Sequence, residues 1–352
     1  MTLKDVAQRA GVSTATVSLV INQAPKAGAI PADTQKRVLD AARELSYRPN
    51  HLARSLRSQR SHTIGVLLPE VSEGYNAGIL TGLERRLLQA NYVYLVAGHR
   101  SRPELLEKYV SLFRDRLVEG LVLINTPLTE SFDLPTIAVA GHDDLPGVHS
   151  VVLDHRHAAD AALGHLAGLG HRSIAVFKGH PGSADTEERM QSILDAVAEF
   201  DLELPPELIL QLSGEGGEKF TPEEGYEEGY AFGRRLLERG EFSALFAFND
   251  VSAIGAMRAF LDAGLDVPGD VSVIGFDDIQ SAAFFNPSLT TVRQPLEEMG
   301  RLAGDVLLRR LRGEEAPAVL TVEPELVVRR STGPPPPHLH RDSPVEVTAD
   351  AD

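Results

Sequence analysis

The stretch TLKDVAQRAGVSTATVSLVIN, at residues 2–22, predicts the first folded element of this chain. Thr2 is a suitable N-cap for a helix that Gly11 ends, and Ser13 is a suitable N-cap for a second helix that Asn22 ends. Two short helices joined by a glycine-containing turn of about three residues make a helix-turn-helix. The stretch therefore predicts an all-α headpiece, which a third helix from about residue 32 to 45 would complete.

In a helix-turn-helix, the first residues of the second helix enter the major groove of DNA. A three-helix bundle that binds another protein is the alternative interpretation. For a DNA-binding headpiece, the base-reading candidates are Thr14, Ala15, Ser18 and Leu19, and the phosphate-binding candidates are Ser13, Thr16 and Asn22.

Charge is unevenly distributed along the chain. The net charge of −16 at pH 7 would argue against a nucleic-acid partner if it were spread evenly. Residues 1–61, however, hold ten Lys or Arg and four Asp or Glu, so they carry +6 and the remaining 291 residues carry −22. A cationic head can bind phosphates while an anionic body is repelled from DNA. A chance asymmetry of solvated surfaces is the alternative.

The segment YRPNHLARSLRSQR, at residues 47–60, connects the basic head to the acidic remainder. In place of a polar spacer, Leu52, Ala53 and Leu56 recur at helical spacing among arginines that include Arg57. This pattern predicts a hinge helix, marginal on its own, that offers cations and an apolar wedge to DNA.

The remaining 291 residues alternate strand-like and helix-like patterns, which predicts parallel α/β sheets. Some ten strands exceed one comfortable layer, so two sheets are expected. No apolar run approaches the roughly 20 residues that span a membrane, and the N-terminus has no signal region. These features and the absence of cysteine indicate a cytoplasmic protein. Residues 334–352 are rich in Pro and acidic residues and are expected to be a disordered tail.

Ligands of open α/β sheets bind beyond the carboxyl ends of the strands. Asp277 and Asn249 each follow a predicted strand, and Arg189 opens a helix after a glycine-containing loop. A carboxylate and a guanidinium can divide the hydrogen bonds of vicinal hydroxyls between them, although structural ion pairs and helix caps are alternative roles. Tyr75 and Asn76 follow the first strand and are further candidates.

No catalytic pattern accompanies these residues. The chain has no Gly-x-Ser-x-Gly nucleophile elbow, and its acidic loop at residues 214–218 lacks the Lys and Ser or Thr of a phosphate-binding loop. We therefore expect no enzyme activity, no metal and no cofactor. A sugar-modifying enzyme with a DNA-binding head and a periplasmic solute receptor are the alternatives, and the basic head without a signal region disfavours the second.

Five motifs, taken in order, resemble the lac/gal repressor (LacI/GalR) family. They are TLKDVA at residues 2–7, GVSTATVSLVIN at 11–22, SYRPN at 46–50, LARSLR at 52–57 and STGP at 331–334. The resemblance implies a helix-turn-helix headpiece, a hinge helix and a two-lobed type I periplasmic-binding-protein-like body with two parallel sheets.

The resemblance also implies boundaries. We expect a headpiece at residues 1–46, a hinge helix at 47–61 and a body at 62–333 whose lobes are joined by three crossings. The N-lobe should comprise about 62–153 and 289–317, and the C-lobe about 154–288 and 318–333. The crossings are then expected near Asp154, residues 286–291 and residues 318–321.

The family's site residues can be carried over one by one. Thr14, Ala15 and Leu19 match base-reading positions, and Leu56 matches the wedge in the minor groove at the operator centre. Family members often carry Arg in place of Leu19; a leucine cannot bond guanine and favours an apolar contact such as a thymine methyl.

In the body, Arg189 and Asp277 match the family's effector-binding arginine and aspartate. Phe220 resembles an aromatic residue that covers the ligand ring, although an extra helical turn after it leaves the register open. The implied function is a ligand-responsive transcription regulator, a repressor that binds a pseudo-palindromic operator as a homodimer. The expected effector is a carbohydrate, with a purine or nucleoside as the alternative.

Overall fold

The computed structural model describes residues 1–22, 24–47, 60–71, 74–128, 130–141, 145–181, 183–212 and 222–337. It divides into two compact units, Met1–Ser61 and His62–Asp352. The hinge candidates Leu52, Ala53, Leu56 and Arg57 lie outside the described residues, and so does Phe220.

The headpiece is the predicted helix-turn-helix with a third helix. Helix α1 spans Leu3–Ala10, α2 spans Thr14–Ile21 and α3 spans Ala32–Glu44, with a short 3-10 helix at Pro25–Ala29 that the sequence did not predict. Thr2 forms a capping box with Asp5, and Gly11 ends α1 with φ 65°, the left-handed conformation that favours glycine.

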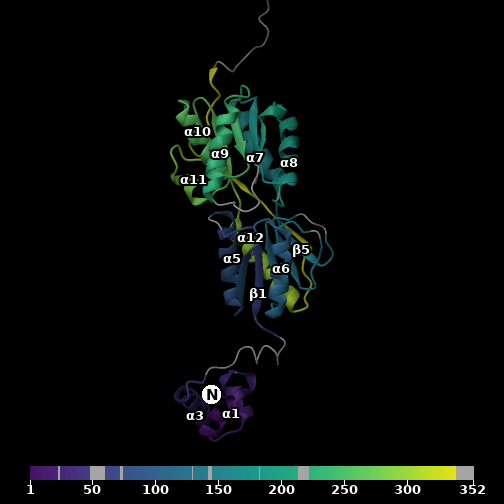
Figure 1. Cartoon of the computed structure of the whole chain (residues 1–352), viewed down its shortest axis with the longest axis vertical. Coiled ribbons are helices and arrows are strands. Elements are labelled where there is room, and N and C mark those ends of the chain that lie inside the picture. Colours follow the sequence, from purple (N-terminus) through teal and green to yellow (C-terminus); the bar gives the residue numbers. More distant parts are fainter. Residues whose placement is uncertain are drawn as a thin grey trace, which may run out of the picture. The chain divides into compact units, whose positions relative to one another are not determined.

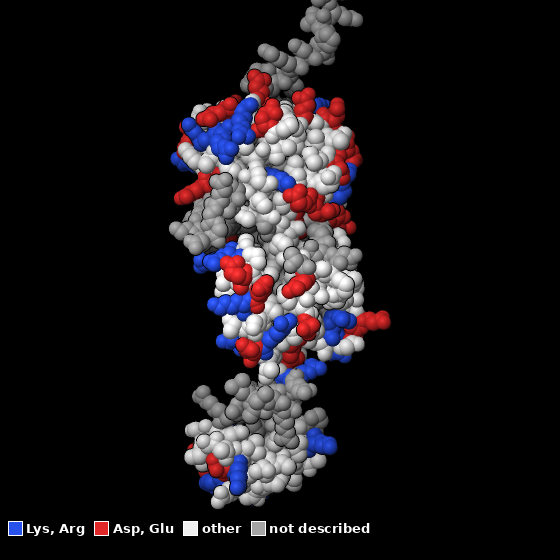
Figure 2. Space-filling view, turned by 45° about the vertical axis from the view of Figure 1, so that its right-hand side comes forward, with Lys and Arg blue, Asp and Glu red and all other residues white. Residues whose placement is uncertain are grey.

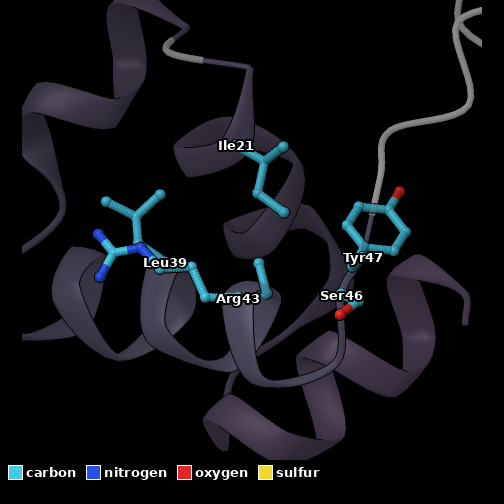
Figure 3. Close-up of a pocket in the computed structure, with 6 residues that line it drawn as sticks. Ile21, Leu39, Arg43, Ser46 and Tyr47 are labelled. Atoms are coloured by element: carbon cyan, nitrogen blue, oxygen red, sulfur yellow. The ribbon is translucent and has the colours of Figure 1, made fainter.

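The three headpiece helices share one small core and one surface groove. The core residues come from all three helices: Val6, Ala7, Ala10, Val17, Val20, Val38 and Ala41. The groove, with a volume of about 390 Å³, lies where the end of α2 faces the second half of α3, and Ile21, Leu39 and Tyr47 line it (Figure 3). Of the predicted base-reading residues, Thr14 and Ala15 lie at the opposite end of α2 from this groove.

The N-lobe of the second unit is built on a parallel sheet in the order β11-β5-β4-β3-β1-β2. Helices α5, α6 and α12 lie around this sheet (Figure 1). The strands are β1 Thr63–Leu68, β2 Val93–Gly98, β3 Gly120–Ile124, β4 Thr136–Val139, β5 Val148–Leu153 and β11 Val319–Val322. The helices are α5 Tyr75–Gln89, α6 Pro103–Asp115 and α12 Leu296–Leu311.

The C-lobe has a second sheet, in the order β12-β10-β9-β8-β6-β7, in which only the β10–β12 pair is antiparallel. Helices α7 to α11 gather around it in Figure 1. The strands are β6 Ile174–Lys178, β7 Ile209–Gln211, β8 Ala244–Ala247, β9 Ser272–Asp277, β10 Thr290–Arg293 and β12 Glu325–Val327. The helices are α7 His155–Leu169, α8 Thr186–Glu199, α9 Pro222–Leu236, α10 Asp250–Asp262 and α11 Gln280–Phe284.

These sheets confirm the predicted fold class, but two of the three lobe crossings lie later than expected. Because β10 pairs with β9, the chain leaves the C-lobe only after Arg293, not at residues 286–291. Because β11 pairs with β5, it leaves the N-lobe only after Val322, not at residues 318–321. Both strands are only four residues long, and so short a run does not reveal which sheet it joins.

Opposite charges lie close together over the face of the second unit that Figure 2 shows. Ion pairs also form within single helices of this unit: Arg301, for example, contacts both Glu298 and Asp305 on α12. None of the described helices combines the length and the apolar composition that a membrane span requires.

Candidate functional sites

Helix α2 presents the predicted DNA-reading residues. Thr14 and Ala15 are exposed, and Ser18 and Leu19 are partly exposed on the same helix. Ser13 accepts a hydrogen bond of 3.1 Å from the backbone N–H of Thr16, so its hydroxyl caps the helix. Other N–H groups of a first helical turn lack partners within the helix and can donate to a phosphate.

The remaining phosphate candidates also have local bonds. The hydroxyls of Ser13 and Thr16 lie 2.9 Å apart, and the side-chain amide of Asn22 donates to the carbonyl of Ser18 at 2.8 Å. These contacts orient short polar side chains at the two ends of α2. The arrangement fits a helix that lies in a groove with phosphates beside both of its ends.

In the second unit, polar side chains from both lobes meet in a buried group that we call the interlobe cluster: Tyr75, Asp185, Arg189, Asp277 and Gln294. Asp277 ends β9, Asp185 and Arg189 belong to the start of α8, Tyr75 begins α5 of the N-lobe, and Gln294 lies at the second crossing. Asp277 therefore lies at the carboxyl end of a strand, which is where the sequence predicted a ligand-binding residue.

Arg189 is held at the centre of the interlobe cluster and is only 3% exposed. Its guanidinium lies between two aromatic rings, 4.0 Å from the ring centroid of Phe248 and 3.7 Å from that of Phe276. One terminal nitrogen donates to the Phe248 carbonyl at 2.7 Å, and another lies 3.9 Å from the carboxylate of Asp185. Because the two rings cover both faces of the guanidinium, a ligand can contact Arg189 only at the edge that carries its N–H groups.

Asp277 is a carboxylate in an unusual electrostatic setting. Burial raises the pKa of Asp277 to about 7, although the charge of Arg189 and a hydrogen bond from Gln294 oppose the shift and Asp185 adds to it. Burial likewise lowers the pKa of Arg189, against the charges of Asp185 and Asp277. Perturbed pKa values of this kind gather at functional sites.

Some buried polar atoms of the interlobe cluster have no hydrogen-bond partner among the described residues. The Tyr75 hydroxyl, Nε of Arg189 and Oε1 of Gln294 are such atoms. A buried polar group without a partner is costly, so such groups call for an explanation such as a ligand or a water. Burial also raises the pKa of Tyr75 well above its usual value, so the phenol stays protonated and can donate.

Two predicted effector candidates have structural bonds instead. The side-chain oxygen of Asn249 accepts from the backbone N–H of Ser252 at 2.8 Å and caps α10. The side-chain amide of Asn76 donates to the carbonyl of Glu70 at 3.0 Å. The helix cap is one of the alternative roles that the sequence left open, whereas the bond from Asn76 to the loop after β1 was not foreseen.

Sequence reasoning missed Asp185, Gln294 and the two aromatic rings on Arg189. Asp185 lies one helical turn before Arg189, which is a detectable spacing for an ion pair. No local sequence pattern marked Gln294 as a site residue, because its contact with Asp277 depends on where the second crossing lies. Contacts across the lobes were equally hidden: the side-chain oxygen of Asn125 accepts from the hydroxyl of Ser183 and the backbone N–H of Ala184, each at 3.0 Å.

Comparisons with known proteins match both parts of the chain. Residues 2–50 match the model of bacterial regulatory proteins of the lacI family, and residues 163–332 match a periplasmic binding protein-like domain. The HTH-type transcriptional repressor PurR of Haemophilus influenzae is 34% identical over 342 residues, which cover 94% of this chain and 98% of PurR.

Solved structures show the same architecture. A lac repressor dimer bound to operator and the anti-inducer ONPF has a TM-score of 0.83 and 28% identity, covering 95% of this chain and 99% of its own. A complex of the transcriptional regulator CelR with cellobiose has a TM-score of 0.68 and 29% identity, covering 94% and 99%. The chain therefore belongs to the LacI family, and it is a DNA-binding transcriptional repressor with an effector-binding, periplasmic-binding-protein-like body.

Proposed function

We propose that this repressor binds its operator as a homodimer and that a small molecule in the interlobe cluster sets its operator affinity. The observation that carries the proposal is the set of unpartnered polar atoms on Tyr75, Arg189 and Gln294. They come from the N-lobe, the C-lobe and the segment between them. A ligand that satisfies all three joins the lobes and favours one arrangement over another, which is the requirement for an allosteric effector.

The chemistry of these atoms favours a ligand with several hydroxyl groups. Nε of Arg189 is a donor, Oε1 of Gln294 is an acceptor, and the hydroxyl of Tyr75 can be either. A sugar hydroxyl both donates and accepts, so neighbouring hydroxyls can meet all three. The effector we propose is therefore a carbohydrate, the kind of ligand present in the CelR–cellobiose complex.

A purine is the second candidate, and the 34% identity to PurR over nearly the whole chain favours it. An oxopurine such as guanine has an amide edge, in which a ring N–H lies beside a carbonyl oxygen. Such an edge can donate to Oε1 of Gln294 and accept from Nε of Arg189, and its flat ring suits a site that contains Phe248.

At the DNA, we propose that Thr14, Ala15, Ser18 and Leu19 read bases while Ser13, Thr16 and Asn22 contact phosphates. The hinge residues Leu52, Ala53, Leu56 and Arg57 would act in the minor groove, with Leu56 as the wedge. Unstacking a base step costs a few kcal/mol, which contacts on the bent duplex offset. This function places the protein in the cytoplasm with its operator.

One experiment tests the effector site. The full chain is screened for thermal stabilisation by cellobiose, ribose, guanine and adenosine, and the compound that stabilises it is added to a fluorescence-anisotropy titration with operator DNA. Arg189→Lys keeps the charge but loses the planar guanidinium between the rings, so it should remain folded and lose the response. Arg258→Lys on α10, whose ion pair with Asp262 is exposed, is the matched control. An unchanged response in Arg189→Lys contradicts the proposed site.

A further inference from the structure

The chain turns after β9 on two residues with an uncommon backbone conformation. Asp277 has φ 111° and Asp278 has φ 55°, both in the left-handed region that residues other than glycine rarely occupy. Such conformations persist only where the surroundings hold them. Because Asp277 is a member of the interlobe cluster, whatever holds this turn also sets the position of its carboxylate.

One side of the turn is held by Asp250, which is fully buried at the start of α10. One carboxylate oxygen accepts from the backbone N–H of Ile279 at 2.8 Å, and the other accepts from the hydroxyl of Thr291 at 2.6 Å. Asp250 thereby holds the backbone of Ile279, the residue after Asp278, and links this backbone to β10 through Thr291.

The other side of the turn is held by ion pairs to Asp278, whose side chain is 9% exposed. One carboxylate oxygen accepts from Nε of Arg293 at 2.7 Å, and the other accepts from a terminal nitrogen of Arg329. Arg329 is itself anchored, because its second terminal nitrogen donates to the carbonyl of Leu289 at 2.8 Å. Two hydrogen-bonded cations in a partly buried setting give a rigid attachment.

We propose that Asp278 is a positioning residue of the effector site: its two arginine contacts fix the main chain that carries the Asp277 carboxylate. This inference rests on the function proposed above. Asp278 does not belong to the interlobe cluster, since its carboxylate is occupied by Arg293 and Arg329. It acts on the ligand through its neighbour.

The same contacts attach the turn to the segments that join the lobes. Arg293 is the last residue of β10 before the second crossing, and it also bonds Glu325, the first residue of β12 after the third crossing, at 3.0 Å. Next in the chain, Gln294 donates to Asp277 at 2.6 Å. Asp278 thus connects the effector carboxylate to both crossing strands, so its loss should affect ligand binding as well as local order.

The test uses the full chain with Asp278→Asn, which removes the charge, keeps the shape and tolerates a positive φ. Asp305→Asn is the matched control, because Asp305 also contacts two arginines, Arg86 and Arg301, but between α5 and α12. Hydrogen–deuterium exchange of the peptide that spans residues 277–282 reports the order of the turn without any ligand. Calorimetric titration with cellobiose and with guanine reports ligand affinity.

In Asp278→Asn, we expect the turn to exchange about tenfold faster and the dissociation constant of the bound probe to rise about tenfold, the effect of losing one charge-assisted hydrogen bond. Asp305→Asn should change neither. Arg293→Lys should retain more affinity than Arg293→Gln, because lysine can still reach Asp278.

Three outcomes overturn the proposal: exchange at the wild-type rate in Asp278→Asn, faster exchange with unchanged affinity, or equal effects in Asp305→Asn. Failure of the proposed function is distinguishable from these, since it appears as wild-type probe binding in Arg189→Lys or as no binding of either probe by the wild-type protein. If Arg189→Lys loses binding and Asp278→Asn does not, only the positioning role is wrong.

Discussion

The side-chain amide of Gln294 donates a hydrogen bond of 2.6 Å to the carboxylate of Asp277. Gln294 lies at the second crossing between the lobes, whereas Asp277 ends a strand of the C-lobe sheet. The bond therefore links the second crossing, one of the segments that join the two lobes, to the Asp277 carboxylate of the interlobe cluster. Any ligand that competes for either partner acts directly on that connection.

Gln294→Leu should weaken effector binding about tenfold, because one hydrogen bond to a charged group is lost. The bond from Gln294 lowers the pKa of Asp277, so its loss should also raise that pKa further. Calorimetry with the effector at pH 8 measures the change. Gln191→Leu, which removes an exposed Gln–Asp bond of 2.9 Å on α8, is the control. Equal affinities in the two variants would remove Gln294 from the site.

The stability of the body should depend on pH through Asp277. Its pKa is raised in the folded protein to about 7, from about 3.8 for an ordinary aspartate. Between these values the folded state holds a proton that the unfolded state has released, so this stabilisation is complete below about 3.8 and is lost as the pH rises through about 7. Above pH 7 the buried charge destabilises the protein.

Asp277→Asn should therefore melt several degrees higher than the wild type at pH 8, since about 1 kcal/mol shifts Tm by roughly 2–4 °C in a unit of this size. The advantage should shrink as the pH falls towards 5. Scanning calorimetry at pH 5, 6, 7 and 8 measures it. A constant difference across this range contradicts the raised pKa of Asp277.

Leu19→Arg should change the base preference of the headpiece. An arginine on this part of α2 can donate two bonds to guanine, which discriminates by about 1–3 kcal/mol per base pair. Anisotropy with operators varied at each half-site position should reveal a new preference for guanine. Leu39→Arg on α3 adds the same charge away from the N-terminus of α2 and should strengthen binding to all sequences alike. If both variants behave alike, Leu19 does not face the bases.

Leu56→Ala should weaken operator binding well beyond its effect on random duplex DNA. The prediction follows from the sequence of the hinge, because a wedge contributes only where the duplex is kinked at the operator centre. Competition titrations with operator and random DNA at one salt concentration compare the two affinities. An equal loss on both would show that Leu56 makes no wedge.

Much of the headpiece was predictable because its determinants are local. The Thr2 capping box, the left-handed Gly11 and the Ser13 cap each depend on residues at most four positions apart, and the structure has all of them. The order of strands and helices in the body was predictable for the same reason, whereas β10 and β11 were too short for their sheets to be inferred.

The sequence by itself determined that this chain is a helix-turn-helix joined to a two-sheet α/β body, because caps, turns and periodicity act within a few residues. It also singled out Arg189 and Asp277 as candidate effector residues. Only the tertiary structure decided that Phe248 and Phe276 cover Arg189 and that Gln294 bonds Asp277. Those contacts join residues from separate strands and crossings, and their proximity follows from how the two sheets are connected and not from any local pattern.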